Sequence, residues 1–216
     1  MKDVLAFLKD IRDHNDREWM QANKKVYLAA KDTFHEFIRE LIAGISKFDE
    51  TVLGLEPKDC TFRLNRDIRF SNDKRPYKVH FGAAIMEGGR KSPNPTYYIR
   101  VEPGKSFLAG GVYRPEAEHL KKIRQEIDYN AGELKKILEE KKFAKTFGPM
   151  TGESLKTAPK GYPKDHPNIE ILRLKSFLVT RDLTDKDVLG KDFLKLVLAD
   201  FEVMSPFNQY LSVAIS

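Results

Sequence analysis

The spacing of apolar residues changes twice along the chain, and this change restricts the fold more than any other feature. In the first 45 residues, apolar side chains recur three or four residues apart, as at Phe34, Ile38 and Leu41, which predicts amphipathic helices. Between residues 60 and 113 they alternate with other side chains, which predicts strands. Helical spacing returns after Pro115. This order is typical of an α+β fold, in which a central antiparallel sheet of about four to six strands lies between N-terminal and C-terminal helices.

Two local signals refine this outline. The segment Glu102-Pro103-Gly104-Lys105 separates two alternating runs, and a Pro-Gly turn there predicts a hairpin and therefore antiparallel pairing. Near the N-terminus, Asn15 precedes Glu18 by three residues, a spacing that resembles a capping box. We therefore expect a helix that begins at Asn15 and carries Trp19 and Tyr27.

Length and composition indicate one domain. The chain has 216 residues, 41% of them hydrophobic, which is enough for one substantial core and short for two, so we assign residues 1–216 to a single domain. No run of 18 apolar residues occurs, and the first residues lack the apolar stretch of a signal peptide. We expect a cytoplasmic protein without a membrane partner. The single cysteine, Cys60, excludes an internal disulfide and a zinc site built on several thiolates.

Positive charge is concentrated in one segment. The whole chain carries a net charge of +6, and residues 62–80 contain six basic residues against the two acids Asp67 and Asp73. We expect this segment, from Phe62 to His80, to form a cationic strand-loop-strand that holds any specific function. Its basic residues are Arg63, Arg66, Arg69, Lys74, Arg75 and Lys78.

Alternation within this segment places Arg66 among apolar neighbours. Because burying an unpaired guanidinium costs several kcal/mol, Arg66 must meet an acid, reach a water-filled pocket or turn outward at a bulge. On the opposite face, Asp67 lies between Arg63 and Arg69 and is placed to hold both. Clustered guanidinium and ammonium groups suit a phosphate or carboxylate, so we predict a small anionic ligand. The predicted ligand-binding residues here are Arg63, Arg66, Arg69, Lys74 and Lys78.

The chemistry beyond binding is left open by the sequence. If the ligand reacts, Asp67, Tyr77 and His166 are the candidates for proton transfer, because the other polar groups are permanently cationic. Asp73 and His80, with Asp67, lack the spacing of a metal site, so no metal is predicted. Neither a phosphate-binding glycine loop nor a dinucleotide fingerprint occurs, so no cofactor is predicted.

Two other functions fit the same segment. Phe62, Phe70 and Tyr77 are interleaved with the basic residues, as in a face that binds nucleic acid. Alternatively the charges pair with one another, and the segment belongs to a structural or protein-interaction module.

The sequence also resembles a known family, the uncharacterised bacterial and fungal proteins grouped as domain of unknown function 2461. The matching motifs include residues 15–19, 62–78, 102–104, 110–115 and 155–167. The resemblance implies no activity. It implies a second basic segment, Lys156 to His166, within a Gly- and Pro-rich loop that we expect to fold over the arginine segment, which adds Lys156 and Lys160 to the predicted ligand-binding residues.

Overall fold

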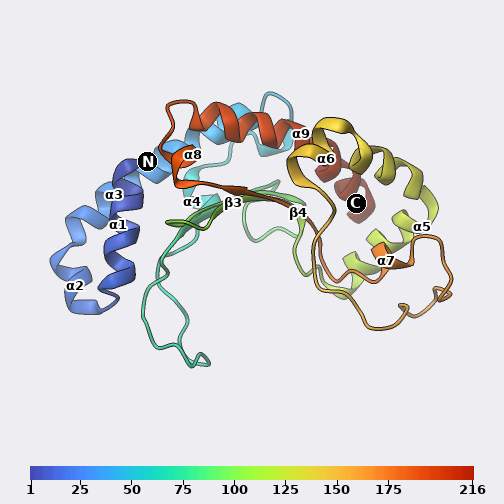
Figure 1. The fold of residues 1–216 in the computed structure, drawn as a ribbon, viewed down its shortest axis with the longest axis horizontal. Helices are drawn as coiled ribbons and strands as arrows, with labels where there is room; N and C mark the ends of the chain where they lie inside the picture. Colours follow the sequence, from blue (N-terminus) through green and yellow to red (C-terminus); the bar gives the residue numbers. More distant parts are fainter.

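The computed structural model describes all 216 residues and is built around a four-stranded antiparallel sheet (Figure 1). The strands lie in chain order: β1 (Phe81–Ile85), β2 (Thr96–Val101), β3 (Ser106–Val112) and β4 (Phe177–Leu183). The predicted hairpin joins β2 to β3, and Gly104 at its turn has φ +73°, a conformation that glycine adopts without strain. The α+β class and the antiparallel sheet are thus confirmed.

The two faces of the sheet differ sharply in burial. Along β2, Tyr97, Ile99 and Val101 are 1% exposed or less, whereas their neighbours Tyr98 and Arg100 are only half-buried. The buried side chains face helix α9 (Phe193–Ile215), which lies along this side of the sheet (Figure 1). We call this the helix face, and the side that carries Tyr98 and Arg100 the second face.

Helices occupy both ends of the chain, as predicted. Their buried apolar side chains join those of the sheet in one cluster of 44 residues. The remaining helices are α1 (Lys2–Asp13), α2 (Arg17–Ala22), α3 (Lys24–Ile45), α4 (Pro57–Cys60), α5 (Ala117–Glu139), α6 (Lys141–Phe147), α7 (Ile169–Leu172) and α8 (Asp185–Leu189), with the 3₁₀ turn η1 (Glu50–Val52). None of the helices combines the length and the apolar character that a transmembrane span requires.

Two long irregular segments, residues 61–80 and 148–168, extend from opposite ends of the sheet (Figure 1). The first was predicted to be a regular strand-loop-strand, and that prediction is wrong. Only isolated bridges occur in it, Thr61 to Ala83 and Asn65 to Tyr77. A proline at position 76, which cannot donate a ladder hydrogen bond, and a turn at Arg69 and Phe70 limit regular pairing.

The helix predicted to begin at Asn15 is divided in two. Asp16, not Asn15, caps α2, because its side chain accepts a hydrogen bond from the Trp19 backbone N–H at 2.8 Å. Tyr27 lies in the next helix, α3. The side chain of Asn15 is therefore free for another contact.

Candidate functional site

Residues 62–80, which we call the basic loop, leave the sheet and return to it beside β1. Three backbone hydrogen bonds define its stem. Phe62 N–H donates to the Gly82 carbonyl at 3.0 Å, Lys78 N–H to the Leu64 carbonyl at 2.8 Å, and Arg66 N–H to the Pro76 carbonyl at 2.9 Å. The stem thus resembles a short hairpin that extends the sheet at its β1 edge.

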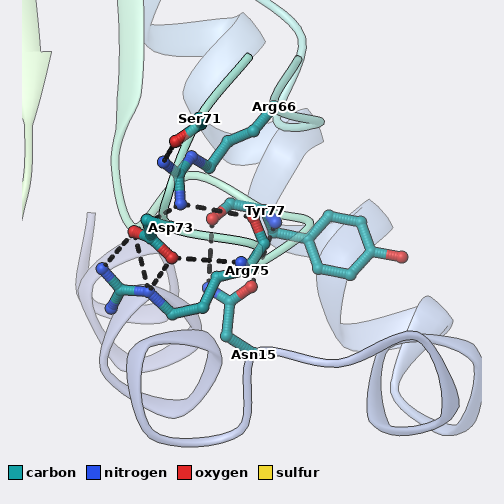
Figure 2. Close-up of polar contacts among 6 residues, drawn as sticks. All are labelled: Asn15, Arg66, Ser71, Asp73, Arg75 and Tyr77. Carbon is teal, nitrogen blue, oxygen red and sulfur yellow. Dashed lines mark hydrogen bonds and ion pairs between the residues drawn. The ribbon is translucent and has the colours of Figure 1, made fainter. Parts of the chain in front are cut away.

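Asn15 fixes the returning half of the basic loop to the helices. Its side-chain amide donates to the Tyr77 carbonyl at 3.1 Å, and its side-chain oxygen accepts from the Tyr77 N–H at 3.0 Å (Figure 2). One amide side chain therefore satisfies both backbone groups of Tyr77, as a neighbouring strand would. The Tyr77 ring points away from the charged network in the same view.

The outer half of the basic loop, residues 66–75, is closed by its own ion pairs. Asp73 binds two guanidinium groups, with Oδ2 at 2.6 Å from Arg66 and 2.7 Å from Arg75 (Figure 2). Arg66, whose side chain is 24% exposed, also donates to the Arg75 carbonyl and to the Ser71 hydroxyl. Hydrogen bonds from Arg75 and Arg66 hold the pKa of Asp73 well below its usual range. The prediction that Arg66 needs an acid is confirmed.

The other charged side chains of the outer half also have partners within the loop. Arg69 binds both carboxylate oxygens of Asp67, at 2.9 and 2.7 Å, and these bonds lower the pKa of Asp67. Lys74 donates to the Ile68 carbonyl at 3.2 Å. Asp67 was expected to hold Arg63 as well, but no ion pair joins the two, because Asp67 turns toward the arginine two residues later in the chain. Each acid of this half is thus bound by at least one of its arginines.

The stem of the loop is different, because its cations lack such partners. Arg63 and Lys78 form no ion pair with any acid, and Arg100 of β2, on the second face, pairs only with Glu102. Burial, together with the nearby charges of Arg63 and Arg100, lowers the pKa of Lys78. We call Arg63, Lys78 and Arg100, with the acid Glu102, the stem cluster. Of these three cations, only Arg100 is paired with an acid.

His80 borders the stem cluster without adding charge at neutral pH. Its side chain is 21% exposed, and its Nδ1 is 3.8 Å from Glu102 Oε2. Burial, with the positive charges of Arg100 and Lys78, lowers the pKa of His80 to about 4, so the imidazole is neutral near pH 7. It can therefore offer a hydrogen bond there but not a positive charge.

The second basic segment lies elsewhere. Lys156, Lys160 and His166 belong to the segment at the far end of the sheet from the basic loop (Figure 1), so the predicted second wall of the site is wrong. That segment is held to its own end of the molecule, since Arg173 donates to the carbonyls of Leu155 and Lys156.

His166 has a structural role. Its Nε2 is 2.9 Å from Asp128 on α5, and its Nδ1 accepts a hydrogen bond from the Asn168 N–H at 3.0 Å. Both ring nitrogens are thus engaged, and neither reaches the basic loop. The three proton-transfer candidates are not brought together, because Asp67 is held by Arg69 and the Tyr77 ring points away from the network.

A hollow of about 570 Å³ lies between the basic loop and the turn that joins α1 to α2. Its charged lining residues are Asp16, Glu18, Arg17 and Lys74, two acids and two bases. Since these charges balance, the hollow suits an anion less well than the stem cluster does.

The chain was compared with family models, curated proteins and solved structures. A model described as a conserved hypothetical protein, DUF2461, matches residues 3–210. The chain belongs to this family. No curated protein and no solved structure matches it. The DUF2461 resemblance inferred from the motifs is therefore confirmed, and the geometry explains two of these motifs, because Asn15 binds the backbone of Tyr77 and Asp73 binds Arg66.

Two residues of this DUF2461 chain that border the stem were missed by sequence reasoning. Tyr98 and Arg100 alternate with the core residues of β2, where any polar or aromatic side chain fits a strand with one buried face. The only available signal was the sequence Arg100-Val101-Glu102, which places a base and an acid on the same face of an extended chain.

Proposed function

We propose that this protein binds a small ligand through a phosphate or carboxylate group at the stem cluster. The observation that supports this is the contrast within the basic loop, where the outer arginines are paired and the stem cations are not. Burial and the positive charges of Arg63 and Arg100 lower the pKa of Lys78, so the three cations repel one another and a bound anion would relieve this repulsion. The predicted residues Arg63 and Lys78 are retained in this site, and Arg100 is added.

The ligand-binding roles predicted for Arg66, Arg69 and Lys74 are replaced by structural ones. Arg66 and Arg69 are paired with acids of the loop and Lys74 donates to a backbone carbonyl, which agrees with the alternative of an internal ion-pair network for this half only. These contacts join residues of the outer half to one another and involve no side chain of the stem cluster. No proton-transfer candidate lies free beside the stem cluster, so we propose binding without a reaction.

The proposal can be tested with two double variants that remove the same charge from the same loop. Arg63→Gln with Lys78→Gln removes two unpaired cations of the stem, and Arg69→Gln with Arg75→Gln removes two paired cations of the outer half. Thermal-shift measurements would use inorganic phosphate, sugar phosphates and dicarboxylates. We expect at least one of these probes to stabilise both the wild type and the Arg69→Gln, Arg75→Gln variant. The affinity of the Arg63→Gln, Lys78→Gln variant for that probe should be at least tenfold lower.

Two results would reject this function. One is that none of the probes stabilises the wild type. The other is that both double variants lose affinity equally, because the effect would then reflect net charge and not the stem cluster.

A further inference from the structure

Three aromatic rings lie in a row across the strands beside the stem cluster. Phe62 is 6.3 Å from Tyr98, and Tyr98 is 5.7 Å from Phe107, measured between ring centroids. The strand register explains the position of the rings. Phe107 pairs with Arg100, and Tyr98 lies two residues before Arg100 on the same face of β2. Gly82, which pairs with Arg100 on the other side, brings Phe62 to this second face. The rings are on the side of the sheet opposite to α9, which packs on the helix face.

A cation accompanies the ring at each end of the row. Lys78 Nζ is 5.6 Å from the centroid of Phe62, and the guanidinium carbon of Arg100 is 5.9 Å from that of Phe107. Phe62 is the accessible ring, at 40% exposure. A group held by Lys78 is therefore within reach of an exposed aromatic surface.

The middle ring of the row, Tyr98, carries a hydroxyl that lies beside Gly82. A side chain at Gly82 would come within 2.9 Å of the Tyr98 hydroxyl oxygen, so the absence of one lets this hydroxyl lie over β1. Burial raises the pKa of Tyr98, so its hydroxyl keeps its proton as a hydrogen-bond donor. No hydrogen bond is made by this hydroxyl within the chain.

From this arrangement we infer that the ligand of the stem cluster is a nucleotide, a phosphate ester whose planar base stacks on Phe62 while the phosphate binds to the stem cluster at Lys78. The inference rests on the proposed anion site and adds the ring as a second recognised group. Stacking of a base on an aromatic side chain is worth a factor of about 5 to 140 in affinity. The nucleotide is either free or part of a single strand, since both present the same two groups.

The closing experiment separates the base from the phosphate. Isothermal titration calorimetry at low salt would compare AMP and UMP with ribose 5-phosphate, which carries the same phosphate and sugar without a base. We expect at least one nucleotide to bind at least fivefold more tightly than ribose 5-phosphate. Phe62→Leu should abolish this difference and leave the affinity for ribose 5-phosphate unchanged.

Phe70→Leu is the matched control. Phe70 is 95% exposed at the tip of the basic loop and has the guanidinium of Arg69 at 5.8 Å, so the substitution removes a similar ring and cation contact outside the site. We expect it to leave nucleotide affinity unchanged. An equal loss with Phe70→Leu and Phe62→Leu would overturn the inference.

The remaining outcomes are also decisive. Equal affinity for the nucleotides and ribose 5-phosphate overturns the nucleotide inference and leaves the anion site in place. No binding of any of these probes overturns the nucleotide inference, and the anion site is then rejected only if the dicarboxylates and inorganic phosphate of the thermal-shift test also fail to bind. An octathymidylate titrated in parallel identifies the source, because a strand should bind more tightly than a mononucleotide and lose affinity steeply with salt.

Discussion

The contact between Asn15 and Tyr77 permits a quantitative prediction for Asn15→Ala. The substitution removes two partly buried hydrogen bonds, of 3.1 and 3.0 Å, each worth about 0.5–1.5 kcal/mol. We expect the free energy of unfolding to fall by about 1–3 kcal/mol, and a loss of about 2 kcal/mol would lower the melting temperature by about 4–8 °C in a chain of this size. Urea denaturation would measure the loss. Because Lys78 follows Tyr77 directly, affinity at the stem cluster should fall too.

Hydrogen exchange would show where the effect of Asn15→Ala lies. The amides of Tyr77, Lys78 and Arg66 form the contact and the stem, so they should exchange faster while the amides of the sheet do not. Asn23→Ala is the control, because the Asn23 side chain makes only a local bond, to the Trp19 carbonyl. A loss below about 0.5 kcal/mol for Asn15→Ala, with unchanged exchange in the loop, would refute this reasoning.

Two other predictions concern the core and the pH dependence of stability. Gly110→Ala would place a side-chain carbon 1.9 Å from the sulfur of Met204, so we expect overpacking to lower the free energy of unfolding by about 1–3 kcal/mol. Urea denaturation would measure this loss, and an unchanged free energy of unfolding would contradict the close approach of α9 to β3. His80 has a folded-state pKa of about 4, against 6.5 for an exposed imidazole, so the unfolded chain binds a proton first as the pH falls. The contribution of neutral His80 to stability is complete above pH 6.5 and is lost as the pH falls toward 4, which lowers the free energy of unfolding by about 2–3 kcal/mol. Between pH 7 and 4.5, the free energy of unfolding of His80→Gln should therefore fall by about 2–3 kcal/mol less than that of the wild type.

The fold was predictable because the signals that define it are local. Periodic apolar residues assigned helices to both ends and strands to the centre, and the Pro-Gly turn fixed the β2–β3 hairpin. The basic loop was not predictable in this way, since its two bridges and the bonds of Asn15 join residues far apart in the chain. Asn15 was interpreted as a cap because a polar side chain before a helix usually has that role.

The proposed site lies in the segment that charge density indicated, but it uses partly different residues. Charge density identified residues 62–80, although it cannot distinguish paired cations from free ones. A local signal for pairing was present twice, in Asp67-Ile68-Arg69 and Asp73-Lys74-Arg75, where each carboxylate binds the arginine two residues later. Arg100 joins the proposed site because of the register between β1 and β2, which the sequence does not reveal. The second basic segment was placed beside the first because both are motifs of the family, and shared motifs do not determine mutual position.

Isolated bridges at the two outer strands of the sheet affect how much of each strand edge is open to another chain. β1 and β4 are the outer strands, and an outer strand with free N–H and C=O groups can pair with another chain. Thr61 bridges Ala83 on one side, and Thr151 bridges Leu178 on the other, so each irregular segment covers an edge of the sheet. By this argument, shortening either segment should expose more of an outer strand, and engineering that does so would have to supply another cover.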